Sequence, residues 1–208
     1  MIKTVLFDLE GTMIHSSETQ IPVLKKLFKY FNVDTVNVDF KTLIGPPLIC
    51  TFENYFGKEN SKLAVEKYIE IFNNLEIENI SHIKGIENCL SYLKNKGYTL
   101  NTVSLQMQEI CERELKILDL YKYFDNIYGD NPEKPHYSKG EIIKETADKF
   151  EKETAVMVGD TKFDVQAGLS CGLNSIWVNW GYGLEQDIPE NINKAKSFEN
   201  LIEIIESL

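Results

Sequence analysis

Arginine is nearly absent from this 208-residue chain: Arg113 is the only arginine among its 22 basic side chains. Any site that needs the forked guanidinium of arginine to hold an anion therefore has a single candidate. Basic residues are also outnumbered by 32 acidic ones, which gives a formal net charge of −10. No basic stripe arises from this composition, so we exclude nucleic acids and anionic membranes as general partners.

Long apolar runs and paired cysteines are missing as well. No stretch approaches the roughly 20 apolar residues of a membrane span. The apolar start of the chain is interrupted by Asp8 and Glu10, which argues against a signal peptide. The spacing of the cysteines fits neither a CxxC motif nor a zinc site, and we expect buried free thiols in a reduced, cytoplasmic protein. The cysteines are Cys50, Cys89, Cys111 and Cys171.

What the sequence does contain is an alternation of two patterns. Short apolar runs typical of buried strands lie at 3–9, 99–104, 125–129, 154–159 and 174–179. Helical periodicity follows most of them, at 86–97, 110–120, 142–150 and 198–208. Such an alternation predicts an α/β fold, in which helices cover both faces of a parallel sheet.

Residues 14–84 interrupt the alternation, because their apolar residues have helical spacing only. We therefore expect a catalytic core formed by 1–13 and 85–208, with a small helical module inserted at 14–84. The segment Gly45-Pro46-Pro47 cannot lie inside a helix. It is either a rigid loop that faces a substrate or an ordinary turn between helices.

Two acidic motifs follow predicted strands. The first, Phe7-Asp8-Leu9-Glu10-Gly11-Thr12, places two carboxylates at a strand end, where open α/β sheets bind ligands. Solvated acids at a strand exit are the other interpretation.

The second motif, Gly159-Asp160-Thr161-Lys162-Phe163-Asp164, also follows an apolar strand. Thr161 and Asp164 have the spacing of a capping box, which accounts for Asp164 but not for Asp160. Asp8 and Asp160 should meet at one edge of the sheet. Their repulsion would raise both pKa values unless a cation separates them, and oxygen ligands of this kind suit Mg²⁺.

Together these motifs resemble the haloacid dehalogenase-like hydrolases, and the resemblance covers essentially the whole chain. It implies a Rossmann-like, doubly wound parallel sheet with an inserted α-helical cap. Three stretches are similar to the phosphoglycolate phosphatase and 5′-nucleotidase group. They are Ile44-Gly45-Pro46-Pro47-Leu48, the second acidic motif, and Trp180-Gly181-Tyr182-Gly183.

The resemblance asks for two further residues. Ser104, at the end of the predicted strand 99–104, fits the required hydroxyl. Lys134 and Lys139 compete for the required lysine. Lys134 precedes a proline, as is common in the family, whereas Lys139 follows Ser138 in a predicted capping box with Glu141. A lysine in the first helical turn is disfavoured by the helix dipole, which suggests a compensating anion, and we favour Lys139.

The resemblance also implies the roles of these residues. Asp8 attacks phosphorus to form an aspartyl-phosphate, and Glu10 protonates the leaving alcohol and then activates water. The phosphate oxygens are held by Gly11, Thr12, Ser104, Leu105 and Lys139. The Mg²⁺ site draws on Asp8, the backbone carbonyl of Glu10, Asp160 and, in an outer shell, Asp164.

The predicted function is therefore a Mg²⁺-dependent phosphatase that hydrolyses a small phosphorylated metabolite similar to phosphoglycolate or a nucleoside monophosphate. The family pattern has Asp where this chain has Glu10, and the extra methylene displaces the acid by up to roughly 1.5 Å. This departure keeps a non-catalytic regulatory or binding protein open, and a phosphomutase on the same fold is a further alternative. We expect a monomer or homodimer in which Arg113 lies outside the cap, so that the cap offers no arginine to the substrate.

Overall fold

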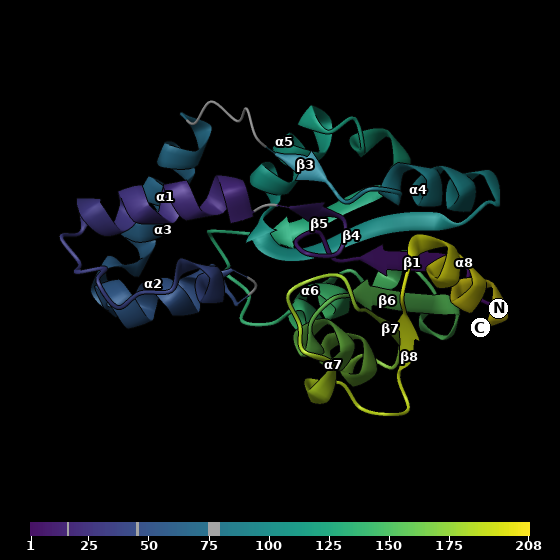
Figure 1. Ribbon diagram of the computed structural model, residues 1–208. Helices are drawn as coiled ribbons and strands as arrows, with labels where there is room; N and C mark the ends of the chain where they lie inside the picture. The colour runs from purple at the N-terminus through teal and green to yellow at the C-terminus, as the bar shows by residue number, and fades with distance from the viewer. Residues whose placement is uncertain (16, 45, 75–79) are drawn as a thin grey trace.

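The computed structural model describes residues 1–15, 17–44, 46–74 and 80–208. Figure 1 shows two parts, a sheet flanked by helices and a smaller group of helices beside the end of the sheet. The chain passes from the first strand into the helical group and then returns to complete the sheet. This arrangement confirms the predicted fold class, an α/β core with an inserted helical module.

The main sheet has six parallel strands in the order β5-β4-β1-β6-β7-β8. The first strand therefore lies near the centre, with later strands added on both sides, as in a doubly wound fold. The strands are β1 (Thr4–Phe7), β4 (Thr99–Met107), β5 (Asn126–Asp130), β6 (Ala155–Gly159), β7 (Asn174–Val178) and β8 (Asn193–Ala195).

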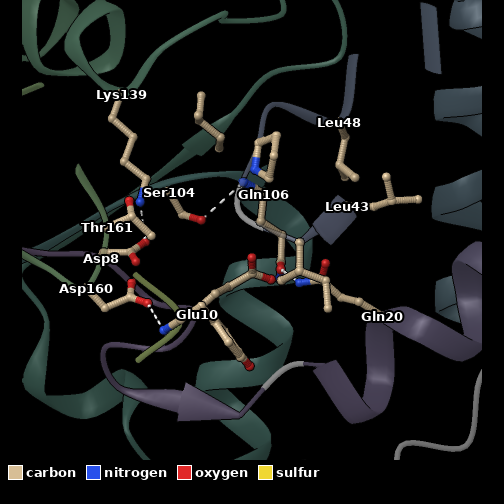
Figure 2. Close-up of a pocket in the computed structure, with 14 residues that line it drawn as sticks. Asp8, Glu10, Gln20, Leu43, Leu48, Ser104, Gln106, Lys139, Asp160 and Thr161 are labelled. Carbon is tan, nitrogen blue, oxygen red and sulfur yellow. Dashed lines mark hydrogen bonds and ion pairs between the residues drawn. The ribbon is translucent and has the colours of Figure 1, made fainter. Parts of the chain in front are cut away.

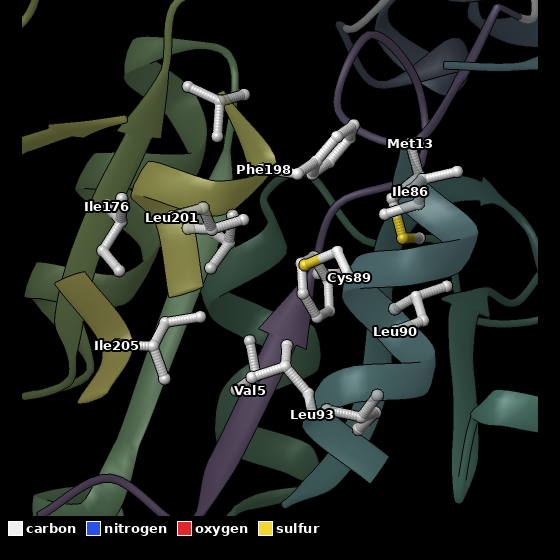
Figure 3. Close-up of a cluster of buried hydrophobic side chains, with 14 of the residues drawn as sticks. Val5, Met13, Ile86, Cys89, Leu90, Leu93, Ile176, Phe198, Leu201 and Ile205 are labelled. Atoms are coloured by element: carbon white, nitrogen blue, oxygen red, sulfur yellow. The ribbon is translucent and has the colours of Figure 1, made fainter. Parts of the chain in front are cut away.

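Helices cover both faces of this sheet. The helices on the face drawn in Figure 3 are α4 (Ile86–Asn95), α5 (Gln108–Ile117) and α8 (Phe198–Ser207), and those on the other are α6 (Lys139–Glu145) and α7 (Lys162–Ser170). Successive side chains of the central strand β1 point to opposite faces of the sheet. Val5 and Phe7 pack with α4, α5 and α8, whereas Leu6 packs with α6 and α7. Every side chain of β1 is buried, as expected for a strand covered on both faces.

The inserted helices have a hydrophobic core of their own. They are α1 (Ser17–Tyr30), α2 (Leu48–Phe56) and α3 (Lys58–Asn73), with a short 3-10 turn at Phe40–Leu43. Phe28, Phe52 and Tyr68 are fully buried at its centre, and the ring of Phe28 packs edge-on against Phe40 and Phe56. The cluster also contains Met107 and Ile110, so the helical module packs directly against β4 and α5.

Several local predictions differ from the structure. Segment 14–84 is not helical alone, because β2 (Ile14–His15) and β3 (Ser81–His82) pair as a short antiparallel ribbon. Strand β8 was not predicted either. Two- and three-residue strands are too short to carry a periodic signal. The boundaries at 13/14 and 84/85 stay a prediction.

The strand around Ser104 and the helix near 150 also differ. Strand β4 continues to Met107, with an irregular register against β5 after Val103, so Ser104 lies inside the strand instead of ending it. Helix α6 ends at Glu145 and does not reach Phe150.

The cysteines are free thiols as predicted, three of them buried and Cys50 half-buried. Among the described helices, none combines the length and the apolar character that a membrane crossing requires.

Candidate active site

The two acidic motifs meet at the carboxyl edge of the sheet. Asp8 follows β1 and Asp160 follows β6, and these strands are direct neighbours that pair Phe7 with Val158. The backbone N–H of Asp8 continues the ladder by donating to the carbonyl of Val158 at 2.9 Å. Parallel neighbours end at the same edge, so the two carboxylates are brought together by strand pairing itself.

Three buried carboxylates form a close cluster there. Ligand oxygens of Asp8, Asp160 and Asp164 all lie within 4.8 Å of one another. The hydroxyl of Thr12 lies 3.2 Å from Oδ2 of Asp8 and 3.3 Å from Oδ1 of Asp160, so its proton is available to both. The side chain of Glu10 is not part of this cluster. It lines the same cavity, on the side that faces Gln20 in Figure 2.

Asp164 has two roles in the structure. It forms the predicted capping box with Thr161 at the start of α7, in which Oδ2 accepts the Thr161 N–H at 2.9 Å. Its other oxygen, Oδ1, pairs with the ammonium of Lys139. The capping box therefore does not exhaust the function of Asp164, because the same carboxylate completes the buried acidic cluster.

Lys139, and not Lys134, is the lysine at the site. Its Nζ lies 2.6 Å from Oδ1 of Asp8 and pairs also with Asp164, and its side chain is 7% exposed. Lys134 is 74% exposed and pairs with Glu145 on the surface. The capping box that was predicted before Lys139 is not formed among the described residues. The hydroxyl of Ser138 makes no capping hydrogen bond, and the carboxylate of Glu141 accepts the backbone N–H of Tyr137 instead.

The electrostatics of the cluster reflect its burial. Burial raises the pKa of Asp8 well above its usual range, and Lys139 opposes the rise while Asp164 and Asp160 add to it. Burial raises the pKa of Asp160 to about 6, and the negative charge of Asp164 adds to the rise. Burial alone would lower the pKa of Lys139, but Asp164 and Asp8 outweigh it and the pKa is raised. The site thus holds more negative charge than its single lysine offsets.

Glycines and backbone groups near the C-terminal strands shape the pocket around Asp160. The backbone N–H of Tyr182 donates to Oδ2 of Asp160 at 2.6 Å, and the indole of Trp177 donates to its carbonyl. A Cβ built on Gly183 would lie 2.0 Å from that carbonyl oxygen, and one on Gly181 would lie 2.2 Å from the carboxylate. The stretch 180–183 matched the family pattern, but its contacts with Asp160 were not predicted.

The acidic cluster opens into a cavity between the sheet edge and the inserted helices (Figure 2). The cavity encloses about 30 Å³. Its lining contains the predicted residues Asp8, Glu10, Ser104, Leu105, Lys139 and Asp160. Gly11 and Thr12, which were predicted to hold phosphate, lie beside this lining. Pro46 belongs to the lining as well, whereas Gly45 of the same predicted loop lies outside the described residues.

Sequence reasoning missed a polar network at the far end of the cavity. Gln20 of α1 and Gln106 of β4 both line it, and Gln20 Nε2 donates to Gln106 Oε1 at 2.7 Å. Gln106 Nε2 in turn donates to Oε2 of Glu114 at 2.7 Å, and the hydroxyl of Thr19 donates to the other oxygen. These residues have no local motif. Only the packing of α1 against β4 and α5 unites them.

Glu114 is the titratable member of this network. It is fully buried in α5. Burial raises its pKa to about 8, and the negative charge of Glu10 adds to the rise. The hydrogen bonds from Gln106 and Thr19 and the charge of Arg113 oppose it without cancelling it. At neutral pH the protonated form of Glu114 is therefore favoured.

We expect Glu114→Gln to flatten the pH dependence of the protein's stability. The pKa of about 8 lies above the ordinary 4.5, so the folded state binds the proton more tightly than the unfolded chain. This stabilisation is complete below about pH 4.5 and is lost as the pH rises through about 8. The loss in the wild type is on the order of 4 kcal/mol, and glutamine, which does not titrate, avoids it.

Urea unfolding at pH 5, 7 and 9 measures this effect, with the exposed Glu109→Gln as the matched control on the same helix. Equal slopes of stability against pH in Glu114→Gln and the wild type would contradict the prediction.

The arginine lies outside the cavity. Arg113 of α5 donates to the carbonyl of Phe72 at 3.0 Å and to the side chain of Asn73, and it stacks on the Phe72 ring. This arginine therefore connects α5, which covers the sheet, with the end of α3 in the inserted module. The expectation that Arg113 lies in a core helix, outside the inserted helices, is confirmed.

Comparison with known proteins decides the family. The model of the haloacid dehalogenase-like hydrolases matches residues 5–178, which is most of the chain. The chain belongs to the haloacid dehalogenase-like hydrolases. It is a phosphatase of this family, that is, a phosphoric monoester hydrolase, which disfavours the alternative of a non-catalytic protein.

Individual relatives support this assignment. A phosphoglycolate phosphatase from Aquifex aeolicus is 33% identical over 202 residues, with 91% of each chain covered. A pyrophosphatase, PpaX, from Bacillus mycoides is 29% identical over 183 residues, covering 86% of this chain and 84% of its own. Among solved structures, a predicted phosphatase from Clostridium acetobutylicum has a TM-score of 0.89 at 27% identity, with both chains fully covered. A family hydrolase from Streptococcus pneumoniae has a TM-score of 0.81 at 27% identity, with 98% of each chain covered.

Proposed function

We propose that this phosphatase is Mg²⁺-dependent and hydrolyses a small phosphorylated metabolite through an aspartyl-phosphate at Asp8. The observation that carries the proposal is the juxtaposition of Asp8 with Lys139 and two further buried carboxylates at the sheet edge. A buried carboxylate held by a lysine and facing a cavity has the position required of a nucleophile toward phosphorus. The relatives named phosphoglycolate phosphatase and pyrophosphatase support phosphate as the reacting group.

The donor set fits Mg²⁺. Among the described residues, three buried carboxylates face one lysine at this site, which leaves an excess of negative charge that a divalent cation would offset, and all the donors are hard oxygens. Asp8 and Asp160 would hold the ion with the backbone carbonyl of Glu10, and Asp164 would act from the outer shell. The bound ion would supply charge stabilisation for the phosphoryl oxygens.

The other residues bind the phosphoryl group or transfer the proton that the leaving alcohol needs. Lys139, Ser104, Leu105 and the backbone N–H groups near Gly11 and Thr12 bind the phosphate oxygens. Thr12 orients the carboxylate of Asp8 through its hydroxyl. Glu10 lines the cavity beside the acidic cluster, donates a proton to the leaving alcohol and then takes one from water. The inserted helices exclude bulk water from this exchange.

Release of phosphate from a panel of small phosphomonoesters tests the proposal. We expect Mg²⁺ to support turnover and EDTA to abolish it, with recovery on adding Mg²⁺ back. Borohydride reduction of the quenched enzyme should convert Asp8 to homoserine, which mass spectrometry of the peptide detects. Turnover that survives chelation, or homoserine at another position, would argue against this mechanism. Appearance of an isomer instead of free phosphate would favour a phosphomutase.

We infer a cytoplasmic protein that acts as a monomer or homodimer on a small molecule, without nucleic acid or membrane partners. The acidic composition supports the exclusion of those partners, since no basic stripe is available to bind them.

A further inference from the structure

The cavity has two chemically distinct ends. At one end lie the acidic cluster and Lys139, where the phosphate is proposed to bind. At the other lie the amide groups of Gln20 and Gln106, which are 2% and 4% exposed. Figure 2 shows the two amides facing each other across the boundary between α1 and the end of β4. A leaving group that extends from the acidic cluster toward the inserted helices meets these carboxamides, with Leu43 and Leu48 beside them.

The amides are held in place by a chain of hydrogen bonds. Glu114 accepts from Gln106, which accepts from Gln20, and the backbone N–H of Gln106 donates to the hydroxyl of Ser104 at 3.1 Å. Each carboxamide carries two N–H groups and one oxygen, so each has hydrogen-bonding capacity beyond what this chain of bonds uses. Anchored amides of this kind discriminate strongly for partners that form hydrogen bonds.

Positive charge is missing from this end of the cavity. Among the described lining residues, Lys139 is the one cation, and it is paired with Asp8 and Asp164 at the phosphate end. Lys25 and Lys29 of α1 line a separate surface hollow. The residues outside the described ranges, at 16, 45 and 75–79, include no lysine, arginine or histidine in the sequence.

One acidic side chain, Glu10, lies near the amides. Glu10 lines the cavity, and it is close enough to Glu114 to influence that carboxyl electrostatically. A carboxylate on the leaving group would lose its hydration there and find no free cation among the described lining residues. A hydroxyl would instead exchange its water hydrogen bonds for those of the amides.

We propose that Gln20 and Gln106 form a leaving-group subsite that selects uncharged, hydroxyl-bearing phosphomonoesters over substrates whose leaving group carries a carboxylate or a further phosphate. The proposal rests on the proposed phosphatase mechanism and adds the substrate class to it. The preference would differ from the substrates named for the Aquifex and Bacillus relatives.

A pair of nearly isosteric substrates tests the subsite. 2-Hydroxyethyl phosphate differs from 2-phosphoglycolate by a hydroxymethyl group in place of the carboxylate. We expect kcat/KM of the wild type to favour 2-hydroxyethyl phosphate by about 10-fold or more. The ratio of the two kcat/KM values, measured on one preparation, does not depend on the fraction of folded enzyme. A wild type that prefers 2-phosphoglycolate overturns the subsite while leaving the phosphatase mechanism intact.

Two substitutions at one position sharpen the test. Gln20→Lys places a cation in the subsite and should shift the ratio at least about 10-fold toward 2-phosphoglycolate. Gln20→Met removes the amide without adding charge and should lower kcat/KM for 2-hydroxyethyl phosphate more than for 2-phosphoglycolate. Gln108→Lys, on the exposed start of α5, is the matched control and should keep the wild-type ratio. An unchanged ratio in both Gln20 variants overturns the proposal. Absence of Asp8-dependent hydrolysis of any phosphomonoester would refute the phosphatase mechanism and the subsite together.

Discussion

Asp8→Asn should lower kcat by about 10³-fold or more while the protein stays folded. Asparagine has the shape of aspartate, so the contacts with Thr12 and the neighbouring strand are preserved. The amide is a poor nucleophile and forms no acyl-phosphate, so the proposed covalent step is lost. The carboxylate that it replaces lies 2.6 Å from the ammonium of Lys139 and is almost completely buried.

The measurement is steady-state turnover of a small phosphomonoester with Mg²⁺, together with thermal unfolding of the same sample. Asp148→Asn is the matched control, because Asp148 is 68% exposed and pairs with the adjacent Lys149. We expect wild-type turnover from this control. Wild-type turnover from Asp8→Asn as well would remove Asp8 from the chemistry.

Lys139→Met should impair both catalysis and stability. The ammonium offsets the charges of Asp8 and Asp164 in a buried site, and its removal leaves those carboxylates unpaired. Removing one partner of a buried ion pair costs about 3–5 kcal/mol of folding free energy. Loss of a donor to the phosphate oxygens should lower kcat by a further factor of about 10²–10³.

The pH dependence separates this effect from a general loss of packing. Without the lysine, the pKa of Asp8 in the folded protein rises further above that of the unfolded chain. The folded state then binds protons more tightly, so its stability is greatest at low pH and falls as the pH rises through the folded pKa. Metal-free Lys139→Met should therefore be less destabilised at pH 5 than at pH 7.

Lys134→Met is the control for this variant, since it removes the competing lysine of the sequence analysis. Its surface pair with Glu145 is screened by solvent and contributes little to stability. Loss of activity in Lys134→Met with retention in Lys139→Met would reverse the assignment of the phosphate-binding lysine.

The acidic motifs could be predicted because their position is encoded locally. An apolar run followed by Asp8, and another followed by Gly159 and Asp160, indicates strand ends without knowledge of the neighbours. Parallel pairing then places strand ends at one edge, and β1 and β6 are in fact adjacent. The alternation of strand and helix patterns determined the fold class for the same reason, because a strand that is buried on both faces appears in the sequence as a short apolar run.

Sequence reasoning favoured Lys139 over Lys134 but did not decide between the two lysines. The helix dipole argument indicated Lys139, yet the hydroxyl of Ser138 does not form the cap on which the placement partly depended. What brings Lys139 to Asp8 is the packing of α6 on the sheet, together with Asp164 from the start of α7. The exposure of Lys134 on the surface argues against it as the phosphate-binding lysine. Exposure is a property of the folded chain and cannot be read from the sequence.

The far end of the cavity was decided by tertiary structure alone. Gln20 and Gln106 lie 86 residues apart, and neither belongs to a motif. Their contact requires the inserted helices to pack on β4 and α5, where Thr19 and Glu114 complete the network. The sequence by itself therefore determined the fold class and the acidic residues, because periodicity and strand ends are local. The groups that would meet the leaving group became visible only in the folded protein, because hydrogen bonds between distant segments leave no periodic trace in the chain.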